Sequence, residues 1–251
     1  NSKLMDWQHR NENGSYDYLL AWHGQRLVGI LGYIATRRYD PALDNCNILW
    51  LALWKVRDDC GITGLGLKLL YELSRLESNK GLAINKILPE HTPLYRALGY
   101  QVVEMKQFYV TNSDKPSRLI SAPPGTILST PSGRKGATFV EMGEIDLREL
   151  APDVLSAGST PFKTPLYFLN RFLLHPFYDY KVFLLNGREG ETALIATRVS
   201  CSQEMRALRI VDFTGSLKLI GQMGECIAKL MNEEDAEYAD SWNYGVPHNY
   251  L

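Results

Sequence analysis

The sequence predicts an α/β (α+β) chain of two tandem units, each a mixed, mainly antiparallel twisted sheet flanked by helices. Apolar runs of strand length alternate with segments whose apolar residues recur every three to four positions, as in amphipathic helices. A hairpin-sized segment, YDYLLAWHGQRLVGILGYIATR at residues 16–37, is matched with one gap by YDYKVFLLNGREGETALIATR at 178–198. The match indicates an internal duplication.

Length, composition and net charge limit the class of protein to which the chain can belong. The 251 residues suffice for one large or two modest domains, and 45% hydrophobic with 22% charged residues is typical of a globular protein. A net charge of −1 disfavours a nucleic-acid partner. No apolar run approaches the roughly 18 residues of a membrane span. We therefore expect a cytoplasmic protein with no nucleic-acid partner and no membrane span; the sequence carries no signal for an oligomeric state.

Four cysteines are scattered along the chain, at Cys46, Cys60, Cys201 and Cys226. They form no CxxC pair and have no metal-ligand spacing. We interpret them as reduced structural thiols and expect no metal.

The first half begins with a helix expected over residues 1–11. Strands at 16–22 and 27–34 follow, joined by the tight hairpin His23-Gly24-Gln25-Arg26. A polar loop then leads to a third strand at 48–54 (ILWLALW), which we expect to be the central strand of the first sheet.

A glycine-rich turn at Gly61, Gly64 and Gly66 connects this third strand to an amphipathic helix. The apolar positions of the helix are Leu65, Leu69, Leu70, Leu73 and Leu76. Glycines let the backbone pass close to a ligand, and a helix N-terminus presents N–H groups to it, so the turn predicts a phosphate site. A glycine pattern by itself is weak, and a tight turn without a ligand remains the alternative.

After the helix we expect a strand at 82–88 and a short helix at 92–98, which has Pro93 in its first turn and Gly99 as a left-handed cap. More strand follows at 100–110. Residues 111–136 are rich in Ser, Pro, Gly, Thr and Lys and read as a linker. The predicted domains are 1–112, a linker at 113–136, and 137–251.

The second half repeats the order of elements. Strands are expected at 138–145, 206–213 and 237–244, and helices at 147–155, 166–174 and 217–231. Where the first half has GITGLG, the second has TGSLKLIG, so its phosphate cradle is expected to be lost. The second half also has about 30 residues before its 166–174 helix that the first half lacks. We favour the interpretation that the first domain lacks its first strand and helix because the 251 residues belong to a longer chain.

Two motifs in the first half resemble the GNAT superfamily of N-acyltransferases, which use acyl-CoA. The family's turn, Arg/Gln-x-x-Gly-x-Gly/Ala, aligns with Gly61-Ile62-Thr63-Gly64-Leu65-Gly66, where Gly61 replaces the leading Arg or Gln. The segment LYRALGY at 94–100 is similar to the family's second signature, LYxxLGF. The resemblance covers about the first 110 residues, and the second half looks like a degenerate second copy.

A narrower resemblance concerns tandem GNAT proteins of bacterial surface-polysaccharide biosynthesis, which acylate nucleotide-linked amino sugars. The phrases DWQHRN, RALRIVDFTG and AEYADSWNYG resemble that subgroup, although less specifically. The function that the resemblance implies is transfer of an acetyl group from acetyl-CoA to a small-molecule amine.

The resemblance also implies where the cofactor lies. Its pyrophosphate would rest on backbone N–H groups of the glycine turn, its pantetheine arm would add beside the third strand, and an N–H near Leu53 would hold the oxyanion. The cofactor-binding residues are then Leu51, Leu53, Gly61, Ile62, Thr63, Gly64, Leu65, Gly66 and Leu67. Loss of the leading Arg or Gln puts some affinity in doubt but not the binding mode.

The family places a proton donor for the departing CoA thiolate at the position of Tyr95, which otherwise packs the short helix onto the sheet. His91 is the candidate for the general base, since histidine is the usual residue for that role near neutral pH, although a loop histidine is more often only solvated. Asp58, Asp59 and Glu90 stay open as alternatives for this base.

For the acceptor, Asp212, Asp240, Trp242 and Tyr244 of the second half offer polar groups beside aromatic faces, which suits a sugar ring. Trp242 and Tyr244 also fit ordinary strand packing, whereas carboxylates among apolar strand residues need a partner. We expect the second half to form the wall against which the acceptor lies.

Two other functions remain open. Fem-type aminoacyltransferases resemble paired GNAT folds and take amino acids from tRNA, but the near-zero net charge and the surviving glycine turn count against that function. A non-catalytic acyl-CoA or nucleotide-sugar binding module is consistent with Gly61 in place of Arg or Gln.

Overall fold

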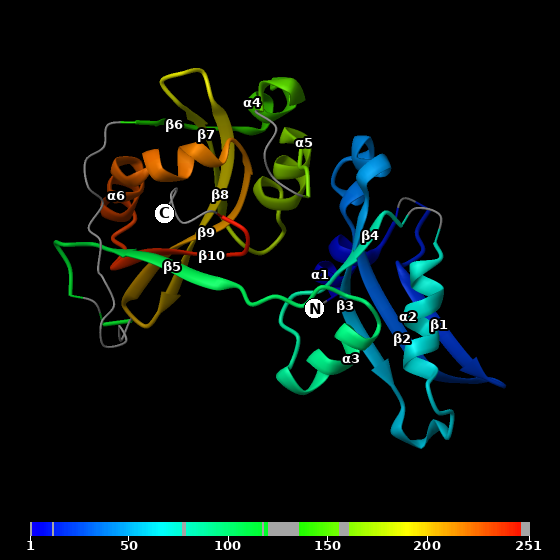
Figure 1. Ribbon diagram of the computed structural model, residues 1–251. Helices are drawn as coiled ribbons and strands as arrows, with labels where there is room; N and C mark the ends of the chain where they lie inside the picture. The colour runs from blue at the N-terminus through cyan, green and yellow to red at the C-terminus, as the bar shows by residue number, and fades with distance from the viewer. Residues whose placement is uncertain are drawn as a thin grey trace. The chain divides into compact units, whose positions relative to one another are not determined.

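The computed structural model describes residues 2–11, 13–76, 79–116, 118–119, 136–155 and 161–246. The chain divides into two compact units, Asn1–Val102 and Val103–Leu251. One contains a four-stranded sheet and the other a six-stranded sheet, each with helices packed on it (Figure 1). Both sheets combine antiparallel pairs with one parallel pair, which confirms the predicted fold class.

The first unit has strand order β1-β2-β3-β4, with only the β3–β4 pair parallel. Its elements are α1 (Ser2–His9), β1 (Tyr18–His23), β2 (Arg26–Ala35), β3 (Ile48–Val56), α2 (Leu65–Ser74), β4 (Gly81–Ala83) and α3 (Thr92–Ala97). The β1–β2 hairpin closes on the pair His23↔Arg26, and Gly24 in the turn has φ +61°. The predicted hairpin is confirmed, with β3 running two residues further than expected.

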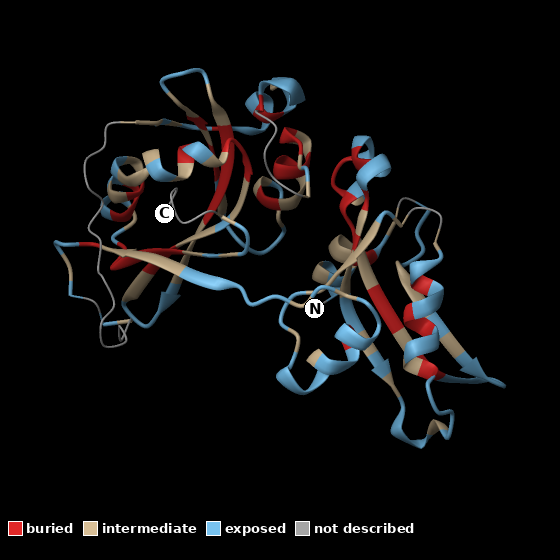
Figure 2. Ribbon diagram, in the orientation of Figure 1, coloured by how far each residue is buried: buried red, intermediate tan, exposed pale blue. Residues whose placement is uncertain are grey.

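The core of the first unit lies between α2 and the sheet. Leu69 and Leu73 of α2 pack on Leu31 and Leu49 of the central strands, and all four are buried. Burying each such side chain contributes about 1.5–3 kcal/mol. In Figure 2 the buried residues of α2 and β2 lie where helix and sheet meet. The apolar positions predicted for this helix therefore face the core.

The central strand β3 and the edge strand β4 pair over a short distance only. β3 and β4 share three residue pairs, which end at Trp50↔Ala83. The expected strand at 82–88 is wrong beyond Ala83, and Lys86 adopts φ +62°, which an extended strand does not allow. A bulge against β2 also leaves Ala52 as an extra residue of β3. The strands therefore diverge next to a bend in β3.

The second unit has strand order β5-β10-β9-β8-β7-β6, with only the β9–β10 pair parallel. Its elements are β5 (Lys106–Thr111), β6 (Thr138–Glu141), α4 (Glu144–Glu149), α5 (Pro165–Phe168) continued by a π-helix η6 (Leu169–Leu173), β7 (Tyr180–Asn186), β8 (Thr192–Ser202), β9 (Met205–Gly215), 3₁₀ helix η7 (Leu217–Gln222), α6 (Gly224–Glu233) and β10 (Tyr238–Asn243). The helices expected at 147–155 and 217–231 are shifted or split, because α4 starts earlier and η7 precedes α6. Ile227 and Leu230 of α6 pack on Ile195 and Leu208 of the sheet.

The strand that follows α3 in sequence belongs to the second sheet. The predicted boundary at 112 assigns this strand to the first domain, but β5 pairs antiparallel with β10 from Lys106↔Asn243 to Thr111↔Tyr238. Val110 packs there against the core beneath α6, which gives the strand a buried face. The boundary at 112 and the linker stay predictions, and linker residues 117 and 120–135 lie outside the described part.

The two units share a sequence of elements, since β1-β2-β3-α2-β4 and β7-β8-β9-α6-β10 have the same strand directions. Each third strand also carries a bulge four residues before its end, at Ala52 and at Val211. However, Tyr18 pairs with Gly32, whereas Tyr180 pairs with Arg198, so the matched hairpins differ in register. The duplication stays a prediction: the topology agrees with it, but the residue match does not keep its register.

Candidate functional site

The glycine turn enters α2 with an open front. Gly61 ends the 3₁₀ helix η3 (Asp58–Cys60) at φ +66°, and Gly64 is the N-cap of α2 at φ +76°. A Cβ at either glycine would meet nothing within 4 Å, so both are glycines for their left-handed conformation. No side chain caps α2, which leaves its first N–H groups for a ligand. The turn therefore fits a pyrophosphate, the group that acetyl-CoA would place there.

Gly66 has a different purpose from the other two glycines. A Cβ there would lie 3.3 Å from Nε1 of Trp54, so the glycine lets α2 approach the indole of β3 closely. The Trp54 ring meets Tyr95 of α3 edge-on, with centroids 6.3 Å apart and an interplanar angle of 67°. Tyr95 in turn meets Tyr100 at 5.9 Å and 76°. This row of rings connects the glycine turn, the bulged strand and the short helix.

Tyr95 is held in this row and is only 4% exposed. Burial raises the pKa of its hydroxyl, and the neighbouring Tyr100 raises it further. The phenol is therefore protonated at neutral pH and is available as a hydrogen-bond donor, not as a base.

The carboxyl half of β3 has one open edge, because its ladder with β4 holds only three pairs. The Arg57 N–H donates to the Val28 carbonyl on β2 at 2.9 Å. Main-chain groups alternate between the two edges of a strand, so Leu53 also faces β2, while Trp54 and Val56 face the open edge. An extended ligand with amide groups can add to such an edge as a strand would.

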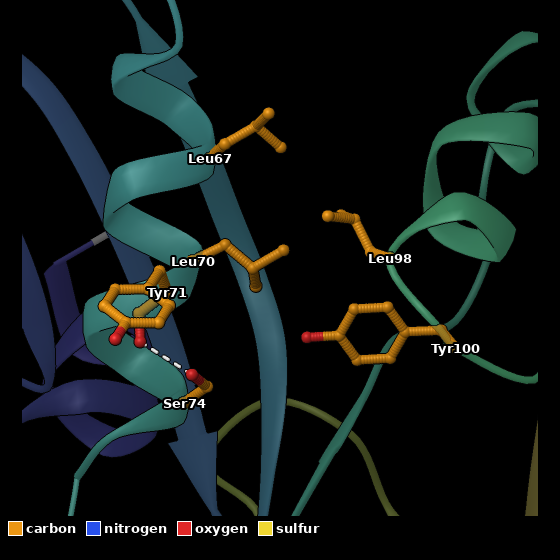
Figure 3. Close-up of a pocket in the computed structure, with 6 residues that line it drawn as sticks. All are labelled: Leu67, Leu70, Tyr71, Ser74, Leu98 and Tyr100. Atoms are coloured by element: carbon orange, nitrogen blue, oxygen red, sulfur yellow. Dashed lines mark hydrogen bonds between the residues drawn. The ribbon is translucent and has the colours of Figure 1, made fainter.

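A hollow of ≈ 170 Å³ lies between α2 and the residues that directly follow α3. Figure 3 shows its lining: Leu67, Leu70, Tyr71, Ser74, Leu98 and Tyr100. The Tyr100 hydroxyl points across the hollow toward α2, and the Ser74 hydroxyl donates to the Tyr71 carbonyl at 2.6 Å. Three leucines and three hydroxyl-bearing side chains therefore form its walls.

Two carboxylates, Asp58 and Asp59, lie just before the glycine turn, and the sequence left open whether they act as bases. Asp59 accepts hydrogen bonds from Arg26 at 2.6 Å and from Arg57 at 3.0 and 3.1 Å. These bonds, from Arg57 first and then Arg26, hold the pKa of the Asp59 carboxyl well below its usual range. Asp58 is almost fully exposed and lies 4.0 Å from the Lys55 ammonium. The two arginines thus offset the repulsion of phosphate that Asp59 alone would cause.

No hydrogen bond, ion pair or ring contact joins His91 to the glycine turn or to the rings of Trp54, Tyr95 and Tyr100 among the described residues. It ends the 3₁₀ helix η4 (Pro89–His91) as an exposed residue just before α3, and Glu90 beside it is exposed too. The role of His91 as general base stays a prediction.

The carboxylates predicted to bind the acceptor are both paired within the second unit. Asp212 forms an ion pair with Lys163. Asp240 is 3% exposed, forms an ion pair with Arg209, and accepts a hydrogen bond from the Gln107 amide at 2.6 Å. Burial raises the pKa of the Asp240 carboxyl. The partners that these strand carboxylates were expected to need are therefore protein groups.

The aromatic residues predicted for the acceptor are exposed. Trp242 is 56% and Tyr244 58% exposed, at the end of β10 and just after it. Trp242 lies directly opposite Gln107 across the β5–β10 pair. Their contact with an acceptor stays a prediction.

The second unit fills the place of the glycine turn with side chains. The segment TGSLKLIG ends β9 and forms η7, in which Leu219 is fully buried in the core. Gly215 is a glycine for packing, since a Cβ there would lie 2.6 Å from Cα of Ala193. This segment therefore has no open turn for a phosphate.

Four site residues escaped the sequence reasoning. Trp54 was expected only as the end of a strand and Tyr100 only as the last residue of the LYRALGY segment, and neither was predicted to line the site. Arg26 and Arg57 are 31 positions apart in sequence and meet only through Asp59. No local pattern connects them.

Neither a metal-binding cluster nor a membrane-spanning helix is found among the described residues. In that part of the chain no three His, Cys, Asp or Glu residues gather in a way that could hold a metal ion. None of its helices has the length and apolar character needed to cross a membrane.

Solved structures share this fold. A GCN5-related N-acetyltransferase from Kribbella flavida matches with TM-score 0.52 and 15% identity over 92% of this chain and 54% of that chain. One from Anabaena variabilis ATCC 29413 matches with TM-score 0.51 and 12% identity over 93% and 57%. A conserved protein of unknown function from Enterococcus faecalis V583, described as an N-acyltransferase candidate, matches with TM-score 0.52 and 12% identity over 90% and 54%.

The chain thus has the fold of GCN5-related N-acetyltransferases and spans about half the length of these structures. At 12–15% identity the likeness shows the fold and not the activity. No protein-family model matches the chain. No curated protein matches its sequence either.

Proposed function

We propose that the chain is an acyl-CoA-dependent N-acyltransferase, with acetyl-CoA as donor and a small-molecule amine as acceptor. The observation that carries the proposal is the glycine turn of the first unit: an uncapped α2 N-terminus behind two left-handed glycines, connected through Trp54 to a protonated, buried Tyr95. The fold shared with known N-acetyltransferases agrees with it.

The residues of the first unit have separate tasks in this proposal. Acetyl-CoA, when bound, would supply the acyl thioester, whose coenzyme A thiolate is the leaving group. The N–H groups at the start of α2 hold its pyrophosphate. The open edge of β3 binds the amides of its arm, and the N–H of Trp54 is the main-chain donor on that edge placed to stabilise an oxyanion. In the proposal Leu51 and Leu53 line the strand, and Leu53 presents its main chain to β2.

Tyr95 serves as hydrogen-bond donor to the leaving sulfur. A phenol whose pKa lies above 10.0 is a weaker acid than a thiol of about 8.5, so complete proton transfer to the thiolate is uphill. Donation of a hydrogen bond to the developing thiolate requires no such transfer and stabilises the transition state more than the ground state.

The acceptor is the least constrained part of the proposal. A nucleotide-linked amino sugar, as in surface-polysaccharide biosynthesis, fits the exposed aromatic rings of Trp242 and Tyr244, on which a sugar ring can stack. His91 is retained as the candidate base for deprotonating the amine, and its exposure gives it access to water.

Release of free CoA thiol from acetyl-CoA, measured over a panel of amines and nucleotide-linked amino sugars, tests the proposal. Tyr95→Phe is expected to lower kcat by about 10²-fold, the lower end of the range for loss of one hydrogen-bond donor to a charge that develops in the transition state. The dissociation constant for acetyl-CoA should stay the same, because the aromatic ring is kept.

The matched control is Tyr178→Phe, which removes an exposed phenol in the second unit. It should leave turnover unchanged. Equal kcat in wild type and Tyr95→Phe would remove Tyr95 from the mechanism.

A binding module without catalysis is the second candidate, because Gly61 stands where the family pattern has Arg or Gln. It predicts saturable acetyl-CoA binding with no CoA release on any acceptor. The same experiment therefore distinguishes the two functions.

A further inference from the structure

We propose that Arg26 and Arg57 form a second phosphate subsite, which binds the 3′-phosphate on the ribose of coenzyme A, outside the glycine turn. The inference rests on the proposed function and deepens it, since it names the group that supplies the side-chain cation missing from the turn.

The two arginines come from different strands and meet at the entrance of the glycine turn. Arg26 begins β2 at the hairpin, and Arg57 follows β3 directly. Asp59, which joins them, belongs to η3, and η3 ends at Gly61. The guanidinium groups therefore lie at the carboxyl end of β3, where the chain turns toward the N-terminus of α2.

Asp59 occupies only part of the donor capacity of the pair. It accepts from one terminal nitrogen of Arg26 and from Nε and one terminal nitrogen of Arg57. Among the described residues, no other hydrogen bond is made by the remaining nitrogens of these two guanidiniums. About half of each arginine side chain is exposed. The pair thus presents oriented N–H donors to solvent and keeps one net positive charge.

The glycine turn itself offers a phosphate no side-chain cation. Residues 61–67, GITGLGL, contain no charged side chain, so the turn can bind phosphate only through its backbone. A phosphate monoester carries about −1.5 to −2 charges at neutral pH and is bound best by the planar donors of arginine. Since an exposed ion pair contributes little to stability, holding Arg26 and Arg57 together for the fold alone would gain the protein little.

Calorimetric titration with coenzyme A and with 3′-dephospho-coenzyme A tests the subsite, because the two ligands differ only in the proposed phosphate. Wild type should bind coenzyme A about tenfold more tightly than the dephospho form. Arg26→Gln and Arg57→Gln should each weaken coenzyme A by several-fold and leave the dephospho form unchanged.

The matched control is Arg37→Gln, which removes an equally exposed arginine paired with Asp44 at the other end of β2. It should change neither affinity. Equal affinity of wild type for both ligands, or variants that behave like the control, would overturn the subsite while leaving the proposed function intact. Absence of binding of both ligands to wild type would overturn the function and the subsite together.

Discussion

Gly61, Gly64 and Gly66 lie in one turn but are glycines for two different physical reasons. Gly61 and Gly64 have φ values that side chains rarely adopt, and open space lies in front of both. Gly66 has ordinary backbone geometry but leaves room for the Trp54 indole. The same residue type therefore shapes the cradle at two positions and at the third brings the helix onto the strand that leads to Tyr95.

His175 is a half-buried titratable residue that the proposed function does not use. Its Nδ1 accepts hydrogen bonds from the N–H groups of Phe177 and Tyr178, both at 3.1 Å, so this nitrogen must be unprotonated. Burial first, and then the charges of Arg171 and Arg198, lower the pKa of His175 from 6.5 to about 4. The folded chain therefore excludes a proton that the unfolded chain takes up.

This shift predicts acid destabilisation of the second unit. The folded pKa lies below the unfolded one, so the free energy of unfolding falls as pH decreases from about 6.5 to about 4. In His175→Asn the amide oxygen can accept the same N–H groups without titrating, so the loss of melting temperature between pH 7.5 and pH 5 should be smaller than in wild type. His23→Asn, at the exposed hairpin, is the control. An unchanged pH dependence in His175→Asn would contradict the assignment.

Single residues were predicted unevenly from the sequence. The glycines and Tyr95 lie in motifs with fixed spacing, so their place in the turn and in the short helix could be predicted. The contacts of Trp54 could not, because which residue of β3 touches α2 depends on the bulge at Ala52, and a shift of one residue reverses the faces of a strand. Tyr100 also lies in a motif, but its ring contact with Tyr95 could not be predicted from the spacing.

Among the elements, β3 matters most for the site. Its first half is paired on both edges, and its second half loses β4 but keeps β2. The hydrophobic run ILWLALW predicted a central strand, yet it gave no sign of where the parallel partner ends. The ladder with β4 ends where the chain turns away near Lys86, which adopts a left-handed conformation. A lysine in the sequence does not signal such a conformation, so the end of the ladder could not be predicted.

β5 shows a second limit of sequence reasoning. Its strand character was predicted, but the expected strand at 100–110 is wrong before Lys106, where β5 begins. Its partner β10 lies far away in sequence, as the bond between Gln107 and Asp240, 133 residues apart, shows. Strand pairing across such a separation is decided by the edge that the folded sheet offers and not by any nearby residue.

The buried carboxylate of Asp240, which joins Gln107 of β5 to Arg209 of β9, gives a prediction for the stability of the three paired strands β5, β10 and β9. Asp240→Ala removes the partner of Arg209 and the acceptor of Gln107, so it should lower the free energy of unfolding of the second unit by about 3 kcal/mol. The control is Glu144→Ala, which breaks the exposed pair with Arg148 and should cost less than about 1 kcal/mol. Urea unfolding measures both. Equal losses would show that the pair does not hold the ladder.

For the molecule as a whole, each unit has its own sheet and its own core, as the alternation of strands and helices predicted. The two units keep the same order of elements but treat the turn after the third strand in opposite ways, open in one and filled by Leu219 in the other. The proposed chemistry therefore depends on a single cofactor site per chain, in the first unit.

Calorimetric titration of the chain with acetyl-CoA tests this account most directly. The account predicts saturable binding with a stoichiometry of one, and a loss of affinity of tenfold or more in Gly64→Ala, where a side chain would disturb the left-handed N-cap. Gly190→Ala, a glycine with φ +85° and equally open surroundings in the second unit, is the matched control and should bind as wild type does. No binding of acetyl-CoA to wild type at millimolar concentration would contradict the account.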